Sequence, residues 1–253
     1  MAARKAGKAV PKAVLAVRRA HTGDWQGAVD ELTTLADGGD VAASAALVPL
    51  LAARGRWREV VTQAEAFLAQ PDAATTANVF EEVCRIVRRA QAELGDGAIV
   101  GRLAALVPDS HEDVRDAVLL EEPPPRRAPN RAAFDKAVLE APKQPRFKKR
   151  PEELPRHLWA LARAFDVDDE IVARFDETAA WATFDVVLVT ASVLTRTGRA
   201  AKAWRLISGR LGAWLPVDPL QPFPAELVTD DGLFALMNDA RWLEVLKTPR
   251  AQR

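Results

Sequence analysis

Apolar residues recur every three or four positions after two similar turns, Gly-Asp-Trp at Gly23 and Gly-Arg-Trp at Gly55. This spacing is typical of a helix with one apolar face. The second stripe follows the first after 32 residues, and the two match position by position. The matching apolar positions are Trp25, Ala28, Val29, Leu32, Leu35 and Ala36 in the first copy, and Trp57, Val60, Val61, Ala64, Phe67 and Leu68 in the second.

The segments before the two turns, from about Val10 to His21 and from Val41 to Ala53, also have helical patterns. Each copy is therefore predicted to be a pair of antiparallel helices joined at the glycine. A single helix pair cannot bury its apolar face, so neighbouring pairs have to stack. The predicted fold class is all-α, with stacked antiparallel helix hairpins in a solenoid or superhelix.

Helical patterns continue through the rest of the chain. Residues 75–94 form a third apolar stripe, followed by a Gly-Asp-Gly turn and a short apolar segment, and Cys84 at the edge of this stripe is expected to be a buried structural thiol. Helices are also expected over 154–165 and 168–182, the second capped by Asp168 or Asp169. Residues 184–194 suit either a buried strand or a helix, and the Thr-Gly-Arg-Ala turn after them favours a helix. Two short helices, about 230–237 and 239–247, end the chain, with Asn238 capping the second.

Residues 121–155 interrupt these patterns because they are rich in proline and basic side chains. Such composition favours extended, solvated backbone. We interpret the stretch as a linker that carries one short helix, Arg131 to Glu140. The predicted organisation is an N-terminal helical half over 1–120 with a basic arm, a Pro-rich basic linker over 121–151, and a C-terminal helical half over 152–253.

The 253 residues have a formal net charge of zero, but the charge is unevenly distributed. Residues 1–19 carry 6 basic and no acidic side chains, residues 20–125 carry 8 basic against 18 acidic, and residues 126–156 carry 10 basic against 4 acidic. Two basic segments therefore flank an acidic body. They can contact a polyanion, dock on the acidic surface of the protein itself, or remain solvated.

Other features of composition indicate where the protein works. Cys84 is the single cysteine, which excludes an internal disulfide and fits a reducing cytoplasm. The longest nearly apolar stretch, residues 41–53, is well short of the roughly 18 residues that span a bilayer. Basic residues interrupt any signal-peptide core near the N-terminus. We expect a cytoplasmic protein without a membrane span, and the bias toward Ala, Leu, Val and Arg is typical of a GC-rich bacterial genome.

The Gly-x-Trp turns resemble those of the tetratricopeptide repeat, a 34-residue helical hairpin with a glycine turn, an aromatic residue, a small residue and a closing proline. Gly55, Trp57, Val60 and Pro71 lie close to those places, and a third match follows Gly198. The likeness covers roughly residues 9–71 and 184–211. It implies binding of a peptide or partner helix in a groove lined by the first helix of each pair. The second copy places only apolar residues there, which argues against a carboxylate clamp: Ala42, Ala45, Pro49, Ala52 and Ala53.

Motifs for catalysis are absent from the sequence: it contains no P-loop, no dinucleotide fingerprint, no H-E-x-x-H and no G-x-S-x-G. The three histidines are far apart, and the acidic cluster at Asp166, Asp168, Asp169 and Glu170 lacks the spacing of a calcium loop, so helix capping explains it better. We expect no catalytic residues, no metal site and no cofactor.

Two groups of basic residues are the candidate binding sites. Arg85, Arg88 and Arg89 share one face of the helix over 75–94, and the linker contributes Arg146, Lys148, Lys149 and Arg150. The leading hypothesis is a non-enzymatic protein-protein interaction module, an adaptor or an inhibitor of the immunity-protein type. The alternative is binding of nucleic acid or another polyanion through the basic arm and linker. The third hypothesis is an enzyme with a composite site that includes His157 and the acidic cluster.

Overall fold

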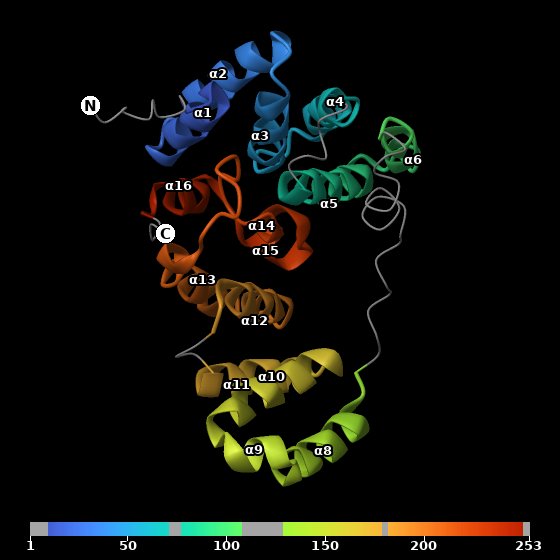
Figure 1. The fold of residues 1–253 in the computed structure, drawn as a ribbon, viewed down its shortest axis with the longest axis vertical. Coiled ribbons are helices and arrows are strands. Elements are labelled where there is room, and N and C mark those ends of the chain that lie inside the picture. Colours follow the sequence, from blue (N-terminus) through green and yellow to red (C-terminus); the bar gives the residue numbers. More distant parts are fainter. Residues whose placement is uncertain (1–9, 71–76, 108–128, 179–181, 250–253) are drawn as a thin grey trace, which may run out of the picture. The chain divides into compact units, whose positions relative to one another are not determined.

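A computed structural model describes residues 10–70, 77–107, 129–178 and 182–249 (Figure 1). In these ranges every regular element is an α-helix or a short 3₁₀-helix, and none is a strand, so the predicted all-α class is confirmed. The chain divides into two compact units. Unit 1 comprises Met1–Glu122, Leu215–Asp230 and Met237–Arg253, and unit 2 comprises Pro123–Trp214 and Asp231–Leu236. The residues after Trp214 are thus divided between the two units.

Unit 1 begins with two helix pairs whose turns have the same backbone geometry. Gly23 and Gly55 adopt φ values of +93° and +66°, which an L side chain rarely takes. Trp25 and Trp57 start the helices that follow and are both buried. Consecutive helices contact one another from the first pair into the next. The four helices are α1 (Lys12–His21), α2 (Trp25–Asp37), α3 (Val41–Ala52) and α4 (Trp57–Leu68).

Helix α3 is the centre of this unit because it is apolar on all sides. Ten of its residues, Ala43 to Ala52, are buried without a break. It contacts α1, α2, α4 and α5 (Ala77–Leu94). A helix that is hydrophobic all round has to be surrounded. The prediction of an open apolar groove here is therefore wrong: Ala42 is half-buried, and the remaining predicted groove residues are buried, namely Ala45, Pro49, Ala52 and Ala53.

Helix α5 carries the predicted third stripe on its inner face. Phe80, Val83 and Val87 are fully buried, and a short helix, α6 (Ile99–Ala104), packs back on α5. Cys84 is also fully buried, as predicted, and burial raises the pKa of its thiol to about 12. The thiol is therefore protonated at neutral pH, which is the unreactive form.

The C-terminal segments of unit 1 fold back on its first helices. Helix α16 (Asp239–Lys247) contacts α1, and α14 (Glu226–Thr229) contacts α5. Rings from three segments meet: Phe223 lies 4.8 Å from Trp242 and 6.5 Å from Trp25, measured between ring centroids. The His21 ring also hydrogen-bonds the Pro222 carbonyl over 2.9 Å. Aromatic burial thus joins the two ends of the sequence in one core.

Unit 2 contains two further helix pairs. Asp166, at φ +56°, lies in the turn between the helices of the first pair, and Gly198, at φ +77°, in that of the second.

The predicted helix over 184–194 is confirmed despite its β-branched residues, and Asp168 and Asp169 lie in the first turn of a helix rather than before it. The elements in chain order are α8 (Arg131–Glu140), η4 (Ala141–Lys143), α9 (Pro145–Lys149), η5 (Pro151–Glu153), α10 (Leu154–Ala164), α11 (Asp168–Thr178), α12 (Phe184–Arg196), α13 (Ala200–Ser208), η7 (Leu211–Ala213) and α15 (Asp231–Leu236).

The Pro-rich basic stretch is folded where the structure describes it. The predicted helix Arg131–Glu140 is confirmed as α8, but the extended backbone expected after it is wrong. Short helical turns follow instead, and their prolines occupy the first or second helical position. Proline is tolerated there because the N–H that it lacks has no partner inside the helix. A small core of Ala141, Phe147 and Leu158 ties these turns to α10.

Candidate binding site on unit 2

The arginines of α5 are engaged within unit 1. Arg85 forms ion pairs with Glu81 and with Glu226, the latter over 3.5 Å, and Arg89 pairs with Glu93 one turn further along the helix. Arg88 is half-buried on the same helix. Because acidic side chains already neutralise Arg85 and Arg89, their charges contribute little to a surface that attracts an anion.

Helix α9 and the residue that follows it hold the second group of predicted residues on the surface of unit 2, namely Arg146, Lys148, Lys149 and Arg150. Buried Phe147 anchors the helix, and its ring centroid lies 4.7 Å from that of His157. Arg146 and Arg150 both pair with Glu153, over 2.6 Å and 3.1 Å. These two hydrogen-bonded arginines lower the pKa of the Glu153 carboxyl, which remains ionised at neutral pH.

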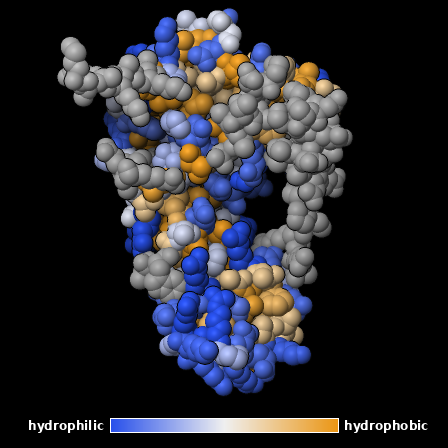
Figure 2. All heavy atoms as spheres, in the orientation of Figure 1, coloured by the Kyte–Doolittle hydropathy of each residue, from blue (hydrophilic) through white to orange (hydrophobic). Residues whose placement is uncertain are grey.

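Lys148 and Lys149 differ from their arginine neighbours. Both are exposed, and within the described residues neither has an ion-pair or hydrogen-bond partner. Figure 2 shows a mostly hydrophilic surface at the end of unit 2 where α8 and α9 lie. Helix α9 is short, and buried Phe147 holds it in place. It exposes two lysines that have no acidic partner among the described residues.

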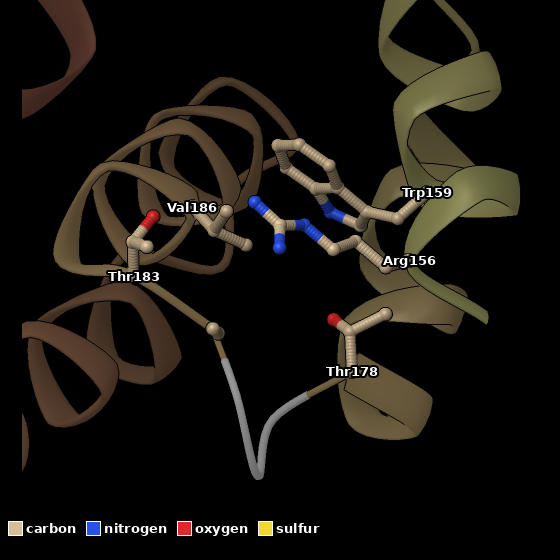
Figure 3. A pocket seen from close by; sticks show the side chains of 6 residues that line it. Arg156, Trp159, Thr178, Thr183 and Val186 are labelled. Carbon is tan, nitrogen blue, oxygen red and sulfur yellow. The ribbon is translucent and has the colours of Figure 1, made fainter. Parts of the chain in front are cut away.

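A small pocket opens on the same unit, where α10, the end of α11 and the start of α12 meet (Figure 3). The pocket is small and partly open to solvent. Among the described residues that line the pocket, one side chain is cationic and none is acidic. The pocket is lined by Arg156, Trp159, Thr178, Ala182, Thr183 and Val186.

The wall of this pocket is mostly apolar, and its hydrogen-bond donors include the Arg156 guanidinium and the Trp159 indole. Trp159 is 5% exposed, and its indole nitrogen has no hydrogen-bond partner within the described part of the chain. The Thr178 hydroxyl is buried and donates to the Phe175 carbonyl over 3.0 Å. The Arg-x-x-Trp spacing places Arg156 and Trp159 on one helix face, but only the tertiary structure brings Thr183 and Val186 opposite them.

The residues of the composite-enzyme hypothesis are engaged in structural contacts. Arg131 bridges Asp169 over 2.9 Å and Glu170 over 3.0 Å, and Arg196 contacts Asp168 over 3.3 Å. Across the described ranges, no cluster of three or more His, Cys, Asp and Glu side chains could hold a metal ion. In the same part of the chain, no helix is both long and apolar enough to cross a bilayer.

Comparisons with known proteins found no relative for this chain: no family model, no curated protein and no solved structure matches it.

Proposed function

We propose that this protein is a non-catalytic, cytoplasmic interaction module that binds another protein through the α9 surface of unit 2, acting as an adaptor or an inhibitor. The proposal rests on how helix α9 is packed and on the two lysines that it exposes. Buried Phe147 fixes the helix, while Lys148 and Lys149 stay exposed and have no ion-pair partner among the described residues. A preorganised pair of cations favours a partner with an acidic patch, because complementary charge steers association and fixes its orientation.

A protein partner fits this surface better than nucleic acid does. Over residues 140–153 there are 5 basic and 3 acidic side chains, so the net charge is only +2. Nucleic-acid binding normally neutralises several phosphates at once. It also uses exposed aromatic rings to stack on bases, and the ring on α9, Phe147, is buried. Of the six basic residues in the predicted N-terminal arm, Arg4, Lys5 and Lys8 lie outside the described residues, and Arg19 is paired with Asp24 and Glu31.

The paired helices provide the scaffold in this proposal. In unit 2, α10 packs against α11, α11 against α12, and α12 against α13, so successive helices support one another. Helical repeats of the type that the Gly-x-Trp turns resemble present binding surfaces on such packed helices. The single cysteine, Cys84, is buried as a free thiol, which fits a reducing compartment.

The test is native purification with a matched pair of charge-reversal variants. The variant Lys148→Glu/Lys149→Glu reverses the two cations of α9. The control Lys202→Glu/Arg205→Glu reverses two exposed cations of α13 in the same unit. We expect the wild type and the control to retain a stoichiometric protein partner, identified by mass spectrometry, and the α9 variant to lose it. Circular dichroism melting checks that both variants are folded.

Three outcomes would contradict the proposal. Absence of a stoichiometric protein from the wild type removes the proposed function. Equal retention of the partner by both variants moves the binding surface away from α9. A nucleic-acid absorbance signal that washes off with salt, and that is lost in the α9 variant, supports polyanion binding instead.

A further inference from the structure

We propose that the pocket between α10, α11 and α12 binds a carboxylate group, with Arg156 and the indole N–H of Trp159 as its principal donors. This site goes beyond the proposed function and does not depend on it, because the pocket residues are different from those of α9. Three observations on the described residues carry the proposal: an unsatisfied buried donor, a cation without an acidic partner, and a helix start without a side-chain cap.

The unsatisfied donor is the indole nitrogen of Trp159. It is shielded from bulk water and has no hydrogen-bond acceptor in the structure. A buried N–H without an acceptor costs about 1–3 kcal/mol, so such groups normally have a partner. The Trp159 residue is only 5% exposed, so packing holds its side chain in place. Trp159 lines the pocket, so an acceptor that enters the pocket is a candidate partner for this N–H.

The cation is Arg156, one helical turn before Trp159. It is exposed, and within the described residues its guanidinium has no ion-pair partner. Other arginines of unit 2, such as Arg131, Arg174 and Arg196, are each paired with an acid. In Figure 3 the guanidinium extends from α10 into the space beside the indole, toward Thr183 and Val186.

The helix start belongs to α12, which has 13 residues. Thr183 is in the N-cap position, but its side chain makes no capping hydrogen bond. The first amide N–H groups of a helix have no partner inside it, and with the helix dipole they favour a negative charge nearby. Thr183 and Val186 both line the pocket, so this end of α12 contributes to the same space.

These donors indicate a monoanion with two acceptor oxygens. One arginine lines the pocket and no acidic residue does, so a single negative charge is matched. A carboxylate can accept from the guanidinium with one oxygen and from the indole or the start of α12 with the other. A phosphate dianion would bring a second charge, for which the described lining has no cation. The carboxylate can belong to a small free acid or to the C-terminus of a peptide.

The experiment follows the indole N–H of Trp159 by ¹⁵N–¹H NMR, using the full chain. Trp159→Phe identifies the signal by removing it. Sodium acetate is added at constant ionic strength against sodium chloride, and a short Ala-Ser-Ala peptide is added with either a free or an amidated C-terminus. We expect acetate to shift the Trp159 signal to saturation, and Arg156→Gln to weaken this binding about tenfold or more, as loss of a charged hydrogen bond does.

The control variant is Arg163→Gln. Arg163 is exposed on the same helix and lies over the Trp159 ring, 6.0 Å from its centroid, but it does not line the pocket. The Arg163→Gln variant should bind acetate with the same affinity as the wild type. The other tryptophan signals report whether each variant is folded. If Arg163→Gln and Arg156→Gln weaken binding equally, general charge explains the effect and the pocket assignment fails.

The ligand series separates the remaining outcomes. Saturation by the free-acid peptide but not by its amide identifies a peptide C-terminus as the source of the carboxylate, and saturation by acetate alone identifies a small free acid. Equal shifts with chloride and acetate, or no shift with any carboxylate, overturn the proposal. Because this readout needs no partner protein, its failure is distinct from failure of the partner-capture experiment on α9.

Discussion

The side-chain amide of Gln221 donates a hydrogen bond to the buried carboxyl group of Glu82 over 2.8 Å, across 139 residues of sequence. Glu82 lies on α5 and is 5% exposed, and its other carboxyl oxygen has no hydrogen-bond partner. This contact therefore joins the middle of unit 1 to the segment after Trp214. Its strength depends on the protonation of Glu82.

Burial raises the pKa of Glu82 to about 8. The carboxylates of Glu226 and Asp218 also raise this pKa, whereas the Gln221 hydrogen bond and the Arg85 cation lower it. Because the folded protein holds this proton more tightly than the unfolded chain, the stabilisation is complete below the ordinary pKa of about 4.5. It is lost progressively as the pH rises to about 8.

We therefore expect Glu82→Gln to reduce the pH dependence of stability. Between pH 5 and pH 8.5 the wild type should lose a few kcal/mol of unfolding free energy relative to the variant, because glutamine cannot ionise. Chemical denaturation at each pH measures this difference. The control, Glu244→Gln, changes an exposed carboxyl of α16 and should follow the wild type. Identical pH profiles for Glu82→Gln and the wild type would contradict the prediction.

The aromatic cluster predicts how strongly the C-terminal helix stabilises unit 1. Trp242 is 3% exposed and contacts the rings of both Phe223 and Trp25. Trp242→Ala should lower the unfolding free energy by about 3–5 kcal/mol because it leaves a cavity. Trp242→Phe should lower it less. Leu243→Ala, at the exposed neighbouring position, should change it by less than about 1 kcal/mol. Similar losses for Trp242→Ala and Leu243→Ala in urea denaturation would refute this role of Trp242.

The turn glycines give a third prediction, with an internal control. Gly55 has φ +66°, so Gly55→Ala should destabilise the protein by about 1 kcal/mol although no neighbour blocks the new methyl group closely. Gly101 lies inside α6, with open space around it. Gly101→Ala should stabilise the protein by about 0.5–1 kcal/mol, because alanine loses less entropy in a helix. Thermal melting distinguishes the two signs, and stabilisation by Gly55→Ala would contradict the strained turn.

Local pattern was sufficient to predict many of the helices. The structure places α8 at the predicted residues Arg131 to Glu140, and α16 at Asp239–Lys247. The predicted cap is also confirmed, since Asn238 accepts from the Arg241 amide over 3.0 Å. The signals involved, which are apolar spacing, a capping side chain and a closing proline, act within a few residues, so a single sequence contains them.

The candidate sites were also predictable only in part from the sequence. The basic character of α9 is evident in the sequence, but the pairing of Arg146 and Arg150 with Glu153, which leaves Lys148 and Lys149 unmatched, depends on how the chain turns at Arg150. The pocket was not predictable, because its donors come from three helices and Trp159 resembles any other buried aromatic residue.

The sequence by itself determined that this protein is built of helices, where most of them begin and end, and which positions are apolar, because these properties follow from local spacing and capping. Only the tertiary structure decided what covers each apolar face. Periodicity could not reveal that neighbouring helices enclose α3, that Gln221 reaches Glu82, or that Arg156 and Trp159 face the start of α12. Such contacts join residues that are far apart along the chain, and their free energy is gained only when the segments pack together.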